Sequence, residues 1–103
     1  MLTFVEDERF IRAAARLLTE DECFELMIKL ATSPEAGNVI PGSSGCRKLR
    51  FSAKGKGSRG GARVIYFFRS QAEQILLLDL YAKNEKSDLS ANEIKRLKFQ
   101  IKS

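Results

Sequence analysis

Two stretches of helical periodicity fill the first third of the chain. In the first, apolar residues recur at intervals of three and four and predict one face of a helix: Phe10, Ile11, Ala14, Leu17 and Leu18. A second helix is expected to begin at the capping box Thr19 to Glu22. Its expected buried face has four members: Phe24, Met27, Ile28 and Ala31. Ser33-Pro34 ends this helix, and the short connection between the two helices predicts an antiparallel hairpin.

Alternating or continuously apolar runs predict the strands. Residues 2–5 suit a short first strand, and after the turn-rich residues 33–45 three more runs follow: Arg47 to Phe51, Arg63 to Phe68 and Ile75 to Tyr81. The last run is nearly continuously apolar, as in a central strand covered on both faces. Tyr66 and Tyr81 lie on these strands and are expected in the core.

A final helix is predicted from the capping box Ser90 to Glu93. Its apolar stripe comprises three residues: Ile94, Leu97 and Ile101. Phe99 lies off this stripe, so it faces either another part of the fold or a partner. The order β, α, α, β, β, β, α predicts one α+β domain over residues 1–103, with helices on one side of an antiparallel sheet.

Charge is distributed unevenly along this pattern. Residues 38–69 contain eight Lys or Arg and no Asp or Glu, whereas residues 1–37 contain four basic and eight acidic side chains. Clustered like charges repel one another, and an anionic partner relieves that repulsion. The central block therefore predicts binding to a polyanion, with RNA as the leading candidate.

Composition excludes several kinds of chemistry. The chain has no histidine, and Cys23 and Cys46 lack the spacing of zinc ligands, so we expect no metal site and no cofactor. The glycine-rich loop, residues 54–61, matches neither a Walker A nor a Rossmann pattern. Without a signal-like apolar segment or a membrane-length run, and with thiols expected to be buried and reduced, the protein is predicted to be cytoplasmic.

The basic block offers residues for RNA cleavage without histidine. If the 2′-OH is aligned with the scissile phosphorus, cations that stabilise the developing charge supply much of the acceleration. Alternation along a strand places Lys48 and Arg50 on one sheet face. Arg63 on the next strand suits bidentate phosphate contact, and Lys83 follows the last strand. The candidate proton carriers are four lysines: Lys48, Lys54, Lys56 and Lys83.

Further residues are expected to contact RNA or the ribosome rather than the reacting atoms. They are Arg47, Lys54, Lys56, Arg59 and Glu85. The lysines and arginine of the glycine-rich loop suit contacts with a phosphodiester backbone, and Glu85 is included because loops at strand ends often carry function.

Three segments together resemble the RelE/HigB superfamily of bacterial toxins, and most closely its HigB-type branch. They are the RKLR run at 47–50, KGKGSRGGARVIYFF at 54–68 and YAKNEKSDLS at 81–90. The resemblance spans nearly the whole chain. It implies the RelE-like fold and the toxin of a type II toxin–antitoxin system. Such a toxin is a bacterial endoribonuclease that cleaves mRNA in the A site of the 70S ribosome.

The same resemblance implies which residues act and what silences them. Basic residues of the family's sheet and strand ends correspond by position to Lys48, Arg50, Arg63 and Lys83. The catalytic tyrosine that RelE has near its C-terminus has no counterpart in the final helix of this chain. The cognate antitoxin would be HigA-like, with a helix-turn-helix DNA-binding domain. Whether it covers the basic cleft or docks on the helices stays open, and a non-catalytic RNA- or ribosome-binding module is the alternative function.

Overall fold

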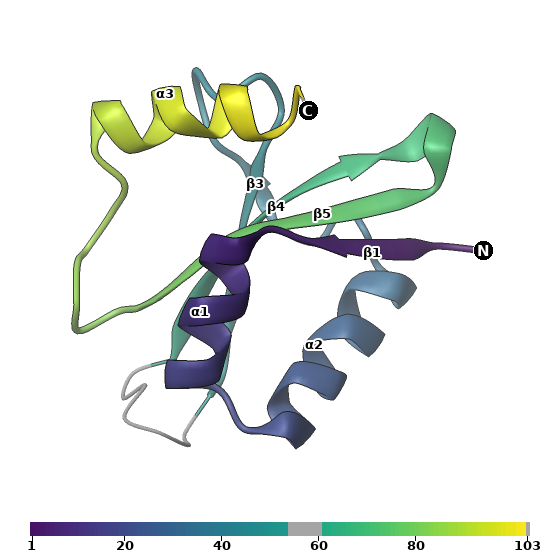
Figure 1. Ribbon diagram of the computed structural model, residues 1–103, viewed down its shortest axis with the longest axis vertical. Helices are drawn as coiled ribbons and strands as arrows, with labels where there is room; N and C mark the ends of the chain where they lie inside the picture. Colours follow the sequence, from purple (N-terminus) through teal and green to yellow (C-terminus); the bar gives the residue numbers. More distant parts are fainter. Residues whose placement is uncertain (54–60, 103) are drawn as a thin grey trace.

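The computed structural model describes residues 1–53 and 61–102, which form a five-stranded sheet with three α-helices (Figure 1). In chain order the elements are β1 (Thr3–Glu6), α1 (Glu8–Leu17), α2 (Glu20–Thr32), β2 (Asn38–Val39), β3 (Arg47–Phe51), β4 (Ala62–Arg69), the 3-10 turn η1 (Ser70–Ala72), β5 (Gln74–Ala82) and α3 (Ala91–Gln100). The expected α+β fold and order of elements are confirmed. The two-residue strand β2, inside the stretch predicted as turns, is an addition.

The sheet is mixed, with strand order β1-β5-β4-β3-β2. β5 pairs with β4, β4 with β3 and β3 with β2, all antiparallel as predicted, but β1 pairs with β5 in parallel (Figure 1). The expectation of a wholly antiparallel sheet is therefore wrong at this edge. The parallel direction carries the chain from β1 through the N-cap residue Asp7 straight into α1, which packs against β5.

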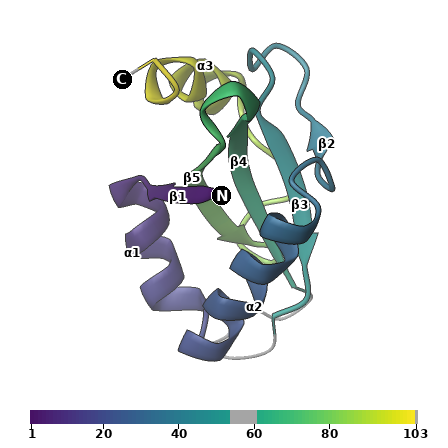
Figure 2. The ribbon, with the colours of Figure 1, turned by 90° about the vertical axis from the view of Figure 1, so that its right-hand side faces the viewer.

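Helices cover both faces of the sheet, not one as expected. The α1–α2 hairpin packs on the face that presents Val64, Tyr66 and Leu77, whereas α3 packs through Leu97 on the face that presents Ile65. Figure 2 separates α3, at the top of the view, from α1 and α2 below it. The cause is β5, because a strand that is apolar on both faces needs cover on both, and all its residues after Gln74 are buried.

The capping box of α2 is confirmed, but its predicted buried face is wrong. Leu26 and Leu30 are fully buried, whereas Phe24 and Ile28 are 67% and 50% exposed. Ala31 is exposed as well, and Met27 is half-buried. Both sides of α2 carry apolar residues one turn apart, so periodicity alone allowed either side to face the sheet. In α1 the same kind of error is confined to Ile11, which is half exposed.

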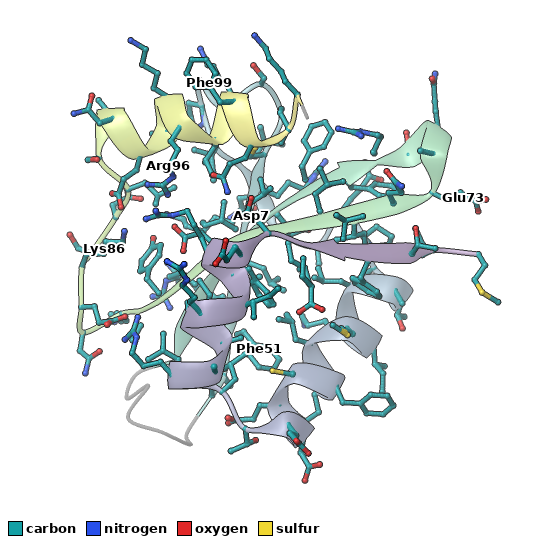
Figure 3. The ribbon with its side chains drawn as sticks, in the orientation of Figure 1. Asp7, Phe51, Glu73, Lys86, Arg96 and Phe99 are labelled. Carbon is teal, nitrogen blue, oxygen red and sulfur yellow. The ribbon has the colours of Figure 1, made fainter. Side chains whose placement is uncertain are left out.

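Ser90 is the N-cap residue of α3, and both hydrogen bonds of the predicted capping box with Glu93 are present. Its apolar stripe packs on the sheet through Leu97, with Ile94 and Ile101 partly buried beside it. Phe99 is 66% exposed and points away from the sheet (Figure 3). Of the two directions considered for Phe99, the structure shows the outward one. Phe51, by contrast, is buried in the core that α1 and α2 cover.

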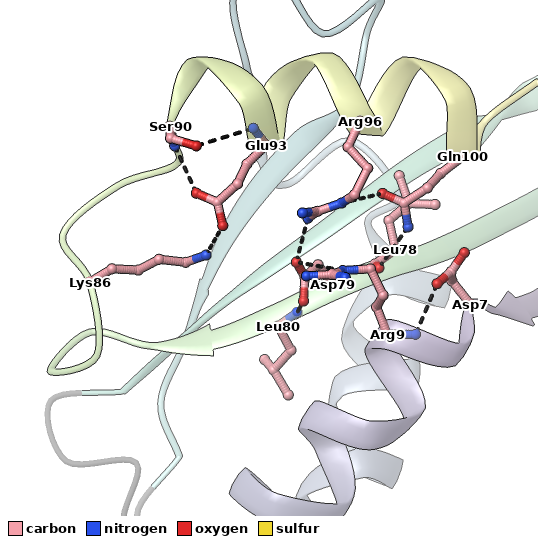
Figure 4. A network of polar contacts seen from close by, with 10 residues as sticks. All are labelled: Asp7, Arg9, Leu78, Asp79, Leu80, Lys86, Ser90, Glu93, Arg96 and Gln100. Atoms are coloured by element: carbon pink, nitrogen blue, oxygen red, sulfur yellow. Dashed lines mark hydrogen bonds and ion pairs between the residues drawn. The ribbon is translucent and has the colours of Figure 1, made fainter.

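β5 contains a bulge next to Asp79, whose carboxylate faces α3. Ile65 pairs with Asp79 and the next residue, Tyr66, pairs with Leu77, so Leu78 has no partner opposite. Asp79 is only 7% exposed and accepts hydrogen bonds from the Leu80 N–H at 2.8 Å and from Arg96 Nη2 at 2.9 Å. Arg9 Nε lies 3.8 Å away (Figure 4). This carboxylate therefore ties α1, β5 and α3 together.

Candidate active site

The register of the sheet brings the predicted cations of β3 and β4 together. Arg50 pairs with Arg63, and Arg63 pairs with Tyr81 on β5. Lys48 occupies the next row on the same face, opposite Ile65. Directly opposite residues place their Cβ atoms roughly 5 Å apart. Lys48, Arg50 and Arg63 therefore form one compact cationic surface, as strand alternation predicted.

A cavity of about 650 Å³ lies beside this surface. Its lining comes from α2, β2, β3, the connection to α3 and α3 itself, and includes Lys29, Asn38, Ile40, Lys48, Arg50, Asp88 and Ile94. Two cations on rigid strands thus line a concave space with an apolar wall. Such a space can hold a short segment of an extended anionic chain.

Asp88 is the acid closest to these cations. Lys48 Nζ donates a hydrogen bond to Asp88 Oδ1 at 3.1 Å. The pKa of Asp88 is lowered, first by the hydrogen bond from the Leu89 N–H and then by Lys48. Among the described residues no carboxylate forms an ion pair with Arg50, Arg63 or Lys83. The surface consequently has an excess of positive charge, and Asp88 neutralises only Lys48.

Tyr81 and Tyr66 differ in how their hydroxyl groups are satisfied. The Tyr66 hydroxyl donates to the Pro34 carbonyl at 2.8 Å and accepts from the Gly37 N–H at 2.9 Å, which confirms its place in the core. The Tyr81 side chain is also buried, but its hydroxyl has no hydrogen-bond partner among the described residues. Buried polar groups nearly always find a partner, so an unpaired one needs an explanation.

The surroundings of Tyr81 relate it to the cationic surface. Burial raises the pKa of its hydroxyl, the charge of Asp88 adds to that rise, and Arg63 opposes it. Lys86 Nζ lies 4.8 Å from the centre of its ring. The hydroxyl is therefore protonated at neutral pH and can donate a hydrogen bond. The strand position was predicted from the sequence, but nothing in the sequence distinguished Tyr81 from Tyr66.

Arg47 and Lys83 do not line the cavity beside Lys48 and Arg50. Arg47 projects to the opposite face and donates to the carbonyl oxygens of Gly37 and Glu35 at 2.7 and 3.2 Å, so it holds the turn after α2 rather than joining the cavity. Lys83 is exposed, and its N–H donates to the Gly61 carbonyl beside the start of β4. Lys54, Lys56 and Arg59 fall outside the described residues.

Glu85 belongs to a second, smaller cavity of about 380 Å³ on the α1 side of β5. Three arginines of α1 line it, at spacings of three and four: Arg9, Arg12 and Arg16. Glu85 accepts hydrogen bonds from Arg16 and from the Ala82 N–H, and the latter is the main reason its pKa is lowered. The structure therefore separates Glu85 from Lys48 and Arg50. The arginine spacing in α1 was a signal that the sequence analysis did not use.

The described residues contain neither a metal-binding cluster nor a reactive buried thiol. Residues 1–53 and 61–102 contain no group of three Cys, Asp or Glu placed to hold a metal ion. Burial raises the pKa of the Cys46 thiol to about 11, although a hydrogen bond with Ser43 opposes the rise, so this thiol is protonated and unreactive. No helix in these ranges has both the length and the apolar character needed to cross a membrane.

Comparison with known proteins gives one family. Residues 6–103 match the model of the RelE toxin of the RelE / RelB toxin-antitoxin system. A mutant of the E. coli toxin RelE in the free state is 19% identical, with a TM-score of 0.63 over 93% of this chain and 97% of that one.

Two further E. coli structures are similar to this chain. The isolated RelE toxin is 16% identical, with a TM-score of 0.57 over 97% of this chain and 99% of that one. The intact RelBE toxin-antitoxin complex gives 16% identity and a TM-score of 0.56 over 78% and 94% of the two chains. At such identities the likeness establishes a shared fold.

Proposed function

Because the chain belongs to the RelE toxin family, we propose that it is a ribosome-dependent mRNA endoribonuclease, the toxin of a type II toxin–antitoxin pair. The observation that carries this proposal is the cationic surface. Arg50 and Arg63 sit opposite each other on rigid strands beside a cavity, and no described carboxylate pairs with them. The segments at 47–50, 54–68 and 81–90 favour the HigB-like branch and hence a HigA-like antitoxin with a helix-turn-helix domain.

The proposed reaction is a transesterification within the RNA strand. The 2′-oxygen of one nucleotide attacks the neighbouring phosphorus, its proton leaves, and the bond to the 5′-oxygen breaks as that oxygen takes up a proton. The products carry a 2′,3′-cyclic phosphate and a 5′-OH. Negative charge accumulates on the phosphoryl oxygens, where planar guanidinium groups bind two oxygens at once. Arg50 and Arg63 are placed to stabilise that charge.

Lys48 and Lys83 are proposed to complete the site. An entering phosphate competes with Asp88 for Lys48, so RNA binding would exchange one ion pair for another. Lys83 directly follows the last residue of β5. It would contact the RNA on the side of the leaving 5′-oxygen. The expected roles of Lys54, Lys56 and Arg59 in holding the RNA backbone remain part of the proposal on the basis of their charge.

We add Tyr81 to the site because its hydroxyl is unpaired among the described residues and because it lies opposite Arg63 in the sheet; its side chain lines the second cavity, beside Arg12 and Glu85. We assign it a positioning role: when RNA draws Lys48 from Asp88, the hydroxyl donates a hydrogen bond to the RNA or to a group that contacts it. A buried donor kept without a partner in the free protein is costly, and a bound ligand recovers that cost.

Expression in a bacterial host tests the proposal. The wild type should arrest growth and generate new 5′ ends within codons of ribosome-bound mRNA, whereas Arg63→Ala should do neither while retaining its circular dichroism spectrum. Lys98→Ala is the control, because it removes an exposed cation of α3 that lines neither cavity. Arrest without new 5′ ends would instead identify a non-catalytic ribosome-binding module. A folded Arg63→Ala, Lys83→Ala double variant with full cleavage would refute the assigned site.

A further inference from the structure

The outer side of α2 carries an apolar stripe that the fold leaves uncovered. Phe24 and Ile28 lie one turn apart and are 67% and 50% exposed, and the exposed Ala31 continues the same side. Leu26 and Leu30 on the opposite side fill the core, so the stripe is not needed to hold α2 on the sheet. Contiguous exposed apolar residues on a small domain indicate an interaction surface more often than isolated ones do.

Acidic residues border this stripe. Glu20, Asp21 and Glu25 are exposed on α2, and no ion pair joins any of them to a described cation. Acids elsewhere in the chain are commonly paired: Glu8, Glu35, Glu73, Asp79, Glu85, Asp88 and Glu93. A chain with a net charge of +5 thus presents a locally negative, apolar helix face.

The chain offers its own contrast on α3. Phe99 is 66% exposed, which is close to the exposure of Phe24, but its neighbours one turn away on either side are Lys95 and Lys102. Lys102 Nζ lies 5.9 Å from the centre of the Phe99 ring. Two helices therefore present similar aromatic groups with opposite charge around them, and the two faces suit different partners.

We propose that the α2 stripe is a docking surface for a cationic amphipathic helix of the antitoxin. This inference rests on the proposed function, in which an antitoxin exists. Apolar side chains of the partner helix would pack on Phe24 and Ile28, as the apolar faces of two amphipathic helices pack together. Lysines or arginines beside them would pair with Asp21 and Glu25. Charge complementarity selects this partner over an RNA strand, which the acidic border repels.

The position of the stripe separates two tasks of the antitoxin. α2 covers one face of the sheet, whereas Lys48, Arg50 and Arg63 lie on the face that α3 covers. The lining of the 650 Å³ cavity includes Lys29 of α2 but neither Phe24 nor Ile28, so a helix docked on the stripe supplies affinity without filling the cavity. Inhibition then requires another segment of the antitoxin that reaches the cavity from the docked helix.

A second copy of this chain is the competing occupant. One cationic counterpart among the described helices is the α3 face around Phe99. Contact between α2 of one copy and α3 of the next joins two different surfaces, and such a head-to-tail contact closes only into a ring or extends into a filament. This outcome is directly measurable as concentration-dependent association.

The test uses full-length protein carrying Arg63→Ala, which allows purification of a non-toxic chain. Binding is measured by titration calorimetry to the antitoxin encoded beside the toxin gene, and in parallel to a helical peptide of about five turns with leucines on one side and lysines beside them. Phe24→Ser, Ile28→Ser should weaken both interactions about 30-fold or more, as expected for central aromatic and aliphatic contacts. The matched control Phe99→Ser should stay within about threefold.

Further variants test the electrostatic part and the competing occupant. Glu25→Lys should weaken binding and reduce its dependence on salt. Unchanged affinity of the Phe24→Ser, Ile28→Ser variant, provided that it keeps the wild-type melting temperature, would overturn the proposal. Sedimentation that shows self-association of the wild type, lost equally with Phe24→Ser and Phe99→Ser, would overturn it in favour of a second copy. Cleavage by the wild type is assayed separately, so failure of the enzymatic proposal leaves the binding result interpretable.

Discussion

Removing one oxygen atom from Tyr81 tests whether its unpaired hydroxyl serves the site. Tyr81→Phe keeps the ring, which is 3% exposed and packs with the α3 side of the core, and deletes a hydroxyl that has no described partner. Tyr66→Phe is the matched comparison, since the same atom there makes two hydrogen bonds. The two substitutions are chemically identical and differ only in what the hydroxyl contacts.

The structure gives opposite expectations for stability. Tyr66→Phe leaves the Gly37 N–H and the Pro34 carbonyl without their partner, and an unsatisfied buried group costs about 1–3 kcal/mol. We therefore expect Tyr66→Phe to lower the free energy of unfolding by roughly 2 kcal/mol. Tyr81→Phe breaks no hydrogen bond with a described residue, so it should change stability by less than about 0.5 kcal/mol, or increase it.

Activity should follow the reverse order. If the Tyr81 hydroxyl binds RNA or a group that contacts it, losing one hydrogen bond of about 1.4 kcal/mol lowers kcat/KM about tenfold. Tyr66→Phe should cleave normally at temperatures where it is folded. Urea unfolding and single-turnover cleavage of ribosome-bound mRNA measure the two quantities. A Tyr81→Phe protein that is as destabilised as Tyr66→Phe would contradict the unpaired hydroxyl, and one with full activity would contradict its role.

Three further predictions concern carboxylates. Asp88→Asn should tighten RNA binding about threefold, measured by filter binding, because it removes an anion from the cavity and frees Lys48; weaker binding would refute this. Asp79→Asn should lower the free energy of unfolding by about 2 kcal/mol, since it weakens buried charged hydrogen bonds, whereas Glu8→Gln, at an exposed pair, should cost below ~0.5 kcal/mol. Burial raises the pKa of Glu93, but hydrogen bonds from Lys86 and Ser90 outweigh this and lower it to about 2. The ionised Glu93 therefore stabilises the fold above the pKa of the unfolded state, and this contribution is lost as pH falls from about 4.5 toward 2. In Glu93→Gln the free energy of unfolding, measured with urea, should fall less steeply over this pH range than in the wild type. An equally steep fall would contradict this.

The parts of the site set by local rules were predictable from the sequence. Alternation along β3 places Lys48 and Arg50 on one face whatever the rest of the chain does. The capping boxes at Thr19 and Ser90 depend on residues three positions apart and were both confirmed. Arg63 joined its predicted neighbours because a short antiparallel strand pair has few alternative registers once the apolar faces are fixed.

The parts that failed depend on tertiary contacts. Periodicity showed two apolar sides of α2, and only packing of Leu26 and Leu30 against the sheet decides which one is buried. The bulge at Leu78 has no sequence signature of its own, so the burial of Asp79 and its bond to Arg96 could not be foreseen. The unpaired Tyr81 hydroxyl is likewise visible only after every neighbouring donor and acceptor has been placed.

The side of α2 that was wrongly predicted to be buried provides a surface for a protein partner that is separate from the cationic surface proposed to bind RNA. Had Phe24 and Ile28 filled the core, the acids beside them would border no apolar surface, and the cationic sheet face would be the main candidate for every partner. Because Leu26 and Leu30 fill it instead, the chain presents positive charge on one sheet face and an acidic, apolar helix on the other. An antitoxin that uses the second surface need not resemble RNA in charge. Substitutions on α2 can then change antitoxin affinity independently of the cations that act on the phosphate.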